Sequence, residues 1–273
     1  MSKNPSLLSL KKSPPIRNIK LTIEYDGTNY CGWQKQGRYL RSVCRIPSSV
    51  SRRPSIQETI EKTLQKILQE KIKLVASGRT DAGVHAQAQV ANFKTKSKLT
   101  LEKIKKALNG LLPKDIVVKK IEEVDLDFHS RFWAKSKVYR YVILNRAYPS
   151  AFLKNRAYFY PYPLDLKIMK KEAKVLLGRH DFSAFAKIDK KPKNSLRTIK
   201  KIKIFKNKNL INIEIEADGF LHNMIRFIIG TLLWIGRHKF SAGTIKKIFK
   251  TKDKKLIGPV VPACGLYLVR VNY

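Results

Sequence analysis

The order of the periodic segments limits this chain to few folds. In some segments apolar and polar side chains alternate, as in half-buried strands, and in others the apolar side chains recur at helical spacing. Six such segments follow one another at residues 19–25, 56–68, 72–75, 84–93, 101–111 and 116–121. Their order is strand–helix–strand–strand–helix–strand. It predicts a split βαβ, or ferredoxin-like, α/β (α+β) domain over residues 17–125 with an antiparallel sheet.

The remaining segments predict a second α/β domain over residues 126–273. Its strands are expected at 138–143, 197–199, 210–215 and 266–271. Its helices are expected at 165–177, stopped by Gly178, and in the apolar stretch 220–236. Residues 1–16 read as a disordered basic tail. Residues 37–54 are polar and arginine-rich and read as an insertion, whose arginines either bind phosphates or form a solvated loop.

A glycine-bracketed turn joins the strands at 72–75 and 84–93. Gly78 and Gly83 flank Arg79 and Asp81, which are two residues apart and so could face one pocket. The residue types leave two interpretations open. Asp81 is either a turn residue that caps the backbone, paired with a solvated arginine, or a catalytic carboxylate beside a guanidinium.

Charge is the compositional fact that bears on function. The 273 residues include 57 Lys+Arg and 20 Asp+Glu, a net charge of +37. Such a charge favours a polyanionic partner, although a general bias towards lysine would also produce it. The three cysteines form no CxxC motif, so we expect no disulfide scaffold and no metal site. This use of cysteine is typical of a protein in the reducing cytoplasm. No run approaches the roughly 20 apolar residues of a membrane span, and the N-terminus lacks a signal-peptide core.

Two further side chains suggest a binding site. Tyr139 lies on a predicted strand beside Lys137, where its ring either stacks on a base or packs in the sheet. Arg226 is a cation in an otherwise apolar helix, so it needs a carboxylate partner. His180-Asp181-Phe182-Ser183 contains the residue types of a hydrolase triad, but triad members come from separate elements.

Several of these stretches resemble one family. The string Gly78-Arg-Thr-Asp-Ala-Gly-Val-His-Ala86 resembles the active-site motif of the tRNA pseudouridine synthase A (TruA) family. The segments around Tyr25–Gln34, Lys137–Tyr141, Gly219–Arg226 and Pro262–Leu268 are also similar to segments of that family. Ser130 and Phe227 depart from the residues usual there.

The resemblance implies two ferredoxin-like, RRM-like domains with antiparallel sheets flanking a basic central cleft, in a cytoplasmic homodimer. It implies isomerisation of uridine to pseudouridine at positions 38, 39 and 40 of the tRNA anticodon stem-loop, without a metal or a small-molecule cofactor. Asp81 would be the nucleophile or base and Arg226 its partner. Tyr139 would stack on the flipped uracil, Arg79 would fill the vacated space, and Leu266 would line the uracil pocket.

Two other classes of protein remain as alternatives. A non-catalytic RNA-binding or ribosome-assembly protein would explain the charge and the aromatic residues, but it would leave uridines unchanged. A metal-dependent nuclease would need a second carboxylate near Asp81, which the neighbouring sequence does not supply.

Overall fold

A computed structural model describes residues 15–34, 53–186 and 194–273. The predicted tail at 1–16 and insertion at 37–54 lie almost wholly outside these residues. Arg53, at the end of the predicted insertion, is described, and its Nη1 donates to the Thr28 carbonyl at 2.9 Å. That arginine therefore contacts the protein's own backbone.

The first half has the predicted order of elements. They are β1 (Arg17–Tyr25), α1 (Ile56–Leu68), β2 (Val75–Ala76), β3 (His85–Thr95), α2 (Leu101–Leu111) and β4 (Ile116–Val124). The strands pair antiparallel in the order β4-β1-β3-β2. This is the strand order of a ferredoxin-like fold, so the prediction of that fold is confirmed.

Local sequence explains where these elements begin and end. Ser55 caps α1, since its side chain accepts a hydrogen bond from the Glu58 N–H, and Thr100 caps α2 in the same way. The strand predicted at 72–75 is confined to Val75–Ala76. Side chains of α1 bind the backbone of Leu74 instead: Glu61 accepts from its N–H at 2.9 Å and Gln57 donates to its carbonyl at 3.3 Å.

The second half repeats the topology of the first. Its elements are β5 (Ser136–Leu144), β6 (Tyr158–Phe159), α3 (Leu166–Lys174), β7 (Gly178–Asp181), β8 (Leu196–Asn207), β9 (Leu210–Ala217), α4 (Met224–Gly236), α5 (Thr244–Thr251) and β10 (Leu266–Asn272). Leaving aside the short β6 and β7, the strand order β10-β5-β9-β8 corresponds to β4-β1-β3-β2. The pairs are again antiparallel.

One predicted boundary in this half is wrong. The helix expected to reach Leu177 ends at Lys174. The N–H groups of Val175, Leu176 and Leu177 bond to carbonyls three residues back, which tightens the chain into a narrower turn. Gly178 then takes φ +94°, a conformation that favours glycine, and begins β7.

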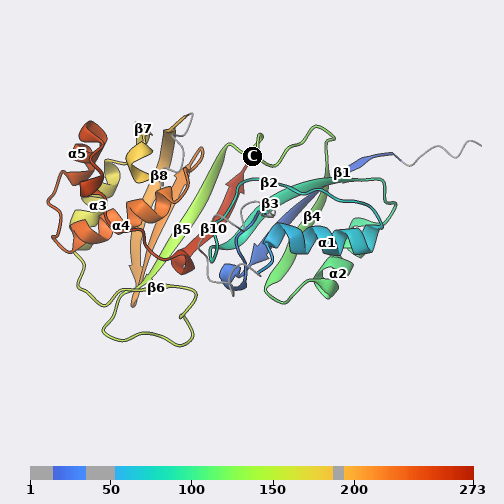
Figure 1. Ribbon diagram of the computed structural model, residues 1–273, viewed down its shortest axis with the longest axis horizontal. Coiled ribbons are helices and arrows are strands. Elements are labelled where there is room, and N and C mark those ends of the chain that lie inside the picture. The colour runs from blue at the N-terminus through green and yellow to red at the C-terminus, as the bar shows by residue number, and fades with distance from the viewer. Residues whose placement is uncertain (1–14, 35–52, 187–193) are drawn as a thin grey trace, which may run out of the picture.

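The two halves join into one ten-stranded sheet (Figure 1). The junction is a parallel pairing of β3 with β10, and only Tyr267 with His85 and Leu268 with Ala86 take part in it. Figure 1 shows α1 and α2 beside the strands of the first half and α3, α4 and α5 beside those of the second. β5 and β10 lie between the two groups of helices, and the Asp81 loop precedes the strand that makes the junction.

The packing of α4 fixes one wall of that junction. The helix is apolar nearly all round and mostly buried. Gly230 touches the segment after α5: a Cβ on this glycine would lie 1.9 Å from the Pro259 carbonyl oxygen. Backbone therefore packs directly on backbone at this crossing, and the position of the whole helix is set by it.

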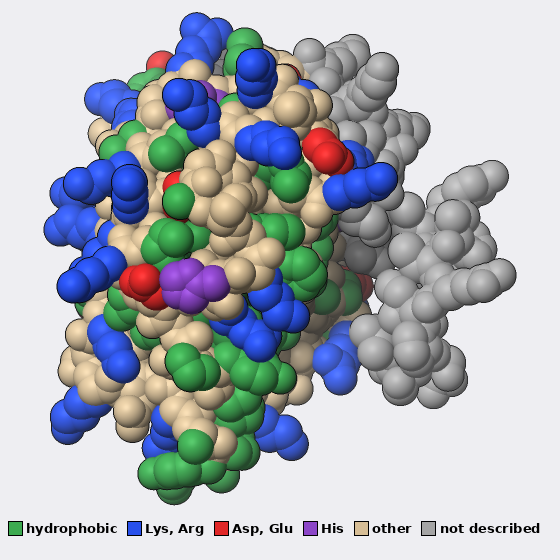
Figure 2. Space-filling view, turned by 90° about the vertical axis from the view of Figure 1, so that its left-hand side faces the viewer, with side chains coloured by type: hydrophobic (Ala, Val, Ile, Leu, Met, Phe, Trp, Pro, Cys, Tyr) green, Lys and Arg blue, Asp and Glu red, His purple; other side chains and the backbone are tan. Residues whose placement is uncertain are grey.

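Basic side chains cover the outer helices. Figure 2 shows many Lys and Arg side chains, and few acidic ones, on the end of the molecule that carries α3 and α5. The exposed lysines of these two helices are Lys167, Lys170, Lys171, Lys174, Lys246, Lys247 and Lys250. The excess positive charge of the sequence thus lies on the surface, in contact with solvent.

Candidate active site

The loop that carries Asp81 leads directly into β3, and its first residues are bonded to that strand. Ser77 N–H donates to the Val90 carbonyl at 2.8 Å, and the Ser77 hydroxyl donates to Gln89 Oε1 at 2.7 Å. The Gln89 amide in turn donates to the Gly78 carbonyl at 2.9 Å. Because Ser77 and Gln89 are buried, these bonds are protected from water, and the loop has little freedom to move.

The end of β1 and the segment that follows it make hydrogen bonds to Thr80 of the loop. Thr80 Oγ1 lies 2.7 Å from the Tyr25 hydroxyl, and the Thr80 carbonyl accepts from Trp33 N–H at 3.0 Å. Gly32 has φ +104°, and a Cβ there would lie 2.7 Å from the Thr80 carbonyl oxygen. The Tyr25–Gln34 segment is therefore structural at these positions: the Trp33 ring is buried beneath the turn.

Two basic side chains flank the Asp81 carboxylate. One lies just before α4 and the other lies in the first turn of that helix. Arg226 Nη1 lies 3.7 Å from Oδ2, and His222 Nε2 lies 3.5 Å from Oδ1. The Asp81 side chain is 32% exposed, so one side of the carboxylate remains open to a ligand. The structure thus brings together the predicted pair of Asp81 and Arg226, which are far apart in the sequence.

The Arg226 guanidinium is oriented by other contacts. Its Nε donates to the Val261 carbonyl at 2.7 Å, and its Nη1 donates to Asn223 Oδ1 at 3.0 Å. These bonds fix the planar group, and Nη1, which donates to Asn223, is also the nitrogen that lies 3.7 Å from Asp81 Oδ2. Asp81 is held in place by a cation that is itself held in place.

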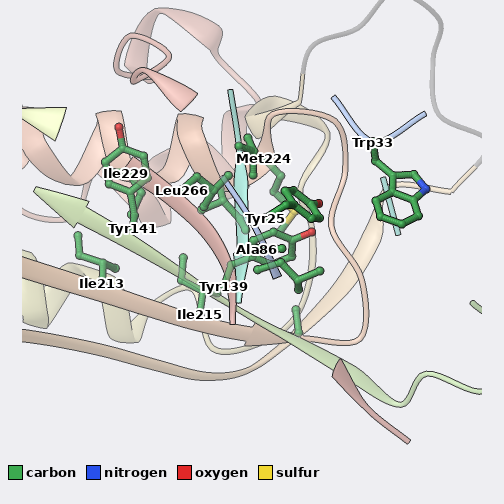
Figure 3. Close-up of a cluster of buried hydrophobic side chains, with 14 of the residues drawn as sticks. Tyr25, Trp33, Ala86, Tyr139, Tyr141, Ile213, Ile215, Met224, Ile229 and Leu266 are labelled. Carbon is green, nitrogen blue, oxygen red and sulfur yellow. The ribbon is translucent and has the colours of Figure 1, made fainter. Parts of the chain in front are cut away.

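Tyr139 and Leu266 lie in an apolar cluster between the halves. Figure 3 shows both side chains near Tyr25, Ala86 and Met224, so that β1, β3, β5, α4 and β10 each contribute a residue. Tyr139 is 7% exposed and packs edge-on against Phe220 with ring centroids 5.2 Å apart. Burial raises the pKa of its hydroxyl, and the neighbouring Tyr25 and Asp81 raise it further. The phenol is therefore neutral at physiological pH.

Arg79 is placed differently from the other predicted site residues. Its side chain is exposed, although the loop that bears it is fixed. No hydrogen bond or ion pair of its guanidinium occurs within the described parts of the chain. An exposed guanidinium beside a half-exposed carboxylate is free to contact a ligand that approaches the loop.

The sequence reading missed His85, which joins three segments. The ring is buried, and its Nδ1 accepts a hydrogen bond from Gly27 N–H at 3.1 Å. Its Nε2 lies 3.2 Å from the Cys264 carbonyl and is the donor there, since the other nitrogen accepts. The ring also stacks on Tyr267, with centroids 4.7 Å apart. Burial lowers the pKa of His85, which keeps the imidazole neutral and preserves this pattern.

His222 was also missed. It precedes Arg226 by four residues, and this spacing is the one signal in the sequence that the two side chains could face the same partner. The actual geometry depends on Asn223, which adopts a left-handed conformation (φ 60°) just before α4. That local turn brings His222 back towards the Asp81 loop.

The His180–Ser183 string has a structural role. The His180 ring bonds to the Leu177 carbonyl at 2.8 Å and stacks on Phe249. Asp181 pairs with Lys252 at 2.5 Å and accepts from Ser183 N–H. His180 and Ser183 do not form the base and nucleophile of a triad.

The arrangement around Asp81 supports nucleophilic or general-base chemistry by a single carboxylate. Within the described residues, no group of three or more His, Cys, Asp or Glu side chains is placed to hold a metal ion. The carboxylate has the Arg226 guanidinium and the His222 imidazole as neighbours, and a neutral phenol lies nearby. A carboxylate oxygen that a ligand can reach is able to attack as a nucleophile or to accept a proton.

Comparison with known proteins gives a consistent result. A family model described as tRNA pseudouridine synthase matches residues 21–133 and 173–273. Curated proteins named tRNA pseudouridine synthase A are similar over 94% of this chain and 100% of their own length: those of Acetivibrio thermocellus and Clostridium acetobutylicum are 44% and 43% identical. The tRNA pseudouridine synthase A 2 of Clostridium perfringens is 46% identical over the same shares. No helix among the described residues has the length and apolar character to cross a bilayer.

Proposed function

The chain belongs to the tRNA pseudouridine synthase A family, and on that premise we propose that Asp81 isomerises uridines at positions 38, 39 and 40 of the tRNA anticodon stem-loop. The chain is accordingly a tRNA-modifying isomerase. The observation that carries the assignment of Asp81 is its half-exposed carboxylate, placed between Arg226 and His222 at the junction of the two halves.

The reaction is an isomerisation that balances without a redox partner. The bond between uracil N1 and ribose C1′ breaks, and a bond between uracil C5 and the same C1′ forms. C5 loses a proton and N1 gains one. Two routes give Asp81 this role: its oxygen attacks as a nucleophile, or it removes a ribose proton to give a glycal intermediate. Both routes use the carboxylate in its ionised form.

The other site residues take supporting roles in the proposal. Arg226 holds the carboxylate charged and oriented, while Tyr139 and Leu266 form an apolar wall for the uracil. The target base must leave its stack, which costs a few kcal/mol. Arg79, exposed on the rim of the loop, fills the space that the base leaves.

Release of tritium from tRNA labelled at uridine C5 tests this function. We expect release with the wild-type protein, also in the presence of EDTA, and none with Asp81→Ala. The matched control is Asp127→Ala, because Asp127 is an exposed carboxylate outside the site. Release by Asp81→Ala at the wild-type rate would contradict the role of Asp81. Binding of tRNA without release by the wild type would instead indicate a non-catalytic RNA-binding protein.

The proposal extends to the assembly and the compartment. We propose a homodimer in the cytoplasm in which one tRNA contacts both subunits across a basic central cleft. The family relationship supports this arrangement. Light scattering of the protein with and without tRNA tests it: a mass of one chain, about 31.5 kDa, would contradict the dimer.

A further inference from the structure

Lys137 lies beside the catalytic loop without a partner of its own. It is the second residue of β5, two positions before Tyr139, so the two side chains leave the same face of the strand. The side chain runs past Gly78: a Cβ built on that glycine would lie 3.5 Å from Lys137 Cε and 3.6 Å from Nζ. The ammonium group is thus held between the strand that carries Tyr139 and the loop that carries Asp81.

The immediate surroundings of Lys137 are positively charged. Arg131 and Arg197 are the cations that act on its charge, and Asp218 is the one carboxylate that does so appreciably among the described residues. Burial lowers the pKa of the ammonium, the two arginines lower it further, and Asp218 opposes them only in part. Within the described residues the ammonium makes no hydrogen bond and no ion pair. Arg140, on the same strand, pairs with Glu214 at 2.6 Å.

Arg197, at the start of β8, and Asp218, directly after β9, both make hydrogen bonds to the backbone. Arg197 Nη1 donates to the Leu196 carbonyl at 2.6 Å, and its Nε would lie 3.5 Å from a Cβ on Gly219. Asp218 accepts from Thr198 N–H at 3.1 Å, which directs its charge to the backbone. Lys137, Arg131 and Arg197 therefore carry an excess of positive charge beside the Asp81 loop, which an anion from outside would neutralise.

A half-buried cation without a partner is costly, and two like charges beside it add to the cost. The cost is offset when a ligand brings a negative charge to the same place. We infer that Lys137, flanked by Arg131 and Arg197, binds the RNA phosphate next to the uridine that turns into the site. This inference rests on the proposed function, since it takes RNA as the ligand and Asp81 as the reacting group.

Neutralising the phosphate tests this contact. The probe is a synthetic anticodon stem-loop RNA in which one phosphate flanking the target uridine is a neutral methylphosphonate, each flank in turn. The nucleotide before the change is 2′-deoxy, and the control RNA has the same deoxynucleotide with an ordinary phosphate. Affinity is measured by fluorescence anisotropy with Asp81→Asn as the background, so that no chemistry occurs during the measurement.

We expect the losses of affinity caused by Lys137→Gln and by the neutral linkage not to add. On control RNA, Lys137→Gln weakens binding about tenfold, the loss of one charge-assisted hydrogen bond. The neutral linkage weakens binding to the background protein by a similar factor, and the two changes together weaken it no further. Lys137→Gln also makes the salt dependence of binding shallower by about 0.7–0.9 in log–log slope, as expected for one phosphate contact.

Two further variants serve as a control and as a second test of the phosphate contact. Lys203→Gln removes an exposed lysine of β8 and is expected to give a small loss that adds to that of the neutral linkage. Arg197→Gln should behave like Lys137→Gln. The melting temperature of Lys137→Gln should equal or exceed that of the background, because an unpaired, repelled charge has gone.

Additive losses at both flanks, or unchanged binding by Lys137→Gln, would overturn the phosphate contact. Those outcomes leave the tritium assay untouched, so they would not bear on Asp81. Conversely, failure of the tritium assay would overturn the proposed function while anisotropy still reported whether a phosphate meets Lys137.

Discussion

Asp81 owes its position to polar side chains that are themselves fixed. Gln89 and Thr80 hold its loop, and Val261 and Asn223 hold the guanidinium that faces it. Local sequence could suggest the carboxylate but not its environment. The motif from Gly78 to Ala86 marked Asp81 by resemblance, whereas turn chemistry alone left its role undecided. His85 and His222 escaped because their partners lie in other segments, and no local pattern indicates such contacts.

His85 gives the protein a pH dependence that one substitution can isolate. Its pKa is lowered in the folded state, so below about pH 6.5 the unfolded chain takes up the proton first. More protons on the unfolded state means that stability falls as the pH decreases, until the folded pKa is reached. The slope approaches at most about 1.4 kcal/mol per pH unit.

Urea unfolding at pH 7 and pH 5 measures this effect. We expect the wild type to lose stability between these values and His85→Gln, which does not titrate, to lose less. The carboxylate of Asp26 faces His85, but its titration lies below the pH range of this measurement. Burial opposes its shift, but hydrogen bonds from Thr28 and the charges of His85 and Arg156 lower its pKa, so its contribution is lost only below pH 4 or so. Equal losses by both proteins would contradict the assignment.

Among the elements, α4 connects packing to the site. Arg226 lies in its first turn, and Gly230 lies one turn further along, on the segment that supplies the Val261 carbonyl. Displacing the helix therefore displaces the guanidinium. A continuous apolar run predicted this helix, and alternation of apolar and polar residues predicted most of the strands.

Substitution of two helical glycines tests that connection. Gly230→Ala places a methyl group 1.9 Å from backbone, so we expect a loss of about 1–3 kcal/mol in unfolding free energy and a lower kcat. Gly110→Ala in α2 meets nothing within 4 Å and should stabilise the protein by about 0.5–1 kcal/mol with unchanged kcat. Chemical denaturation and single-turnover rates measure both. A fully active, fully stable Gly230→Ala would show that the crossing does not set the helix position.

The start of α5 could not be predicted from local sequence, because its capping group comes from another helix. The helix α5 has Gly243 at its start and no side-chain cap of its own. Its cap is the buried Glu172, whose carboxylate accepts from Gly243 N–H at 2.7 Å and from Ile245 N–H at 3.3 Å. A cap supplied from α3 leaves no local signature at residues 241–244, so only the assembled structure reveals it.

For the whole molecule, the net charge of +37 has opposite effects on folding and binding. Self-repulsion destabilises the compact state, while the same charge attracts RNA. The two halves were predictable one by one, since each has its own order of strands and helices. Their junction was not, because it consists of two residue pairs between segments about 180 positions apart.

Salt separates these two effects of charge. Raising sodium chloride from about 0.05 to about 0.5 M shortens the screening length and should raise the melting temperature of the free protein by several degrees. The affinity for tRNA should fall over the same range. Differential scanning calorimetry and anisotropy give the two readings. A melting temperature that falls with salt would mean that attractive ion pairs, rather than repulsion, dominate the folded state.

The pairing of β3 with β10 also has a consequence for biosynthesis. A ribosome makes the Asp81 loop about 180 residues before β10, so the nascent chain carries the Asp81 carboxylate through that interval without the strand that pairs with β3 beside it. The pairs of Tyr267 with His85 and of Leu268 with Ala86, and the bond from His85 to the Cys264 carbonyl, can therefore form only after β10 has left the ribosome.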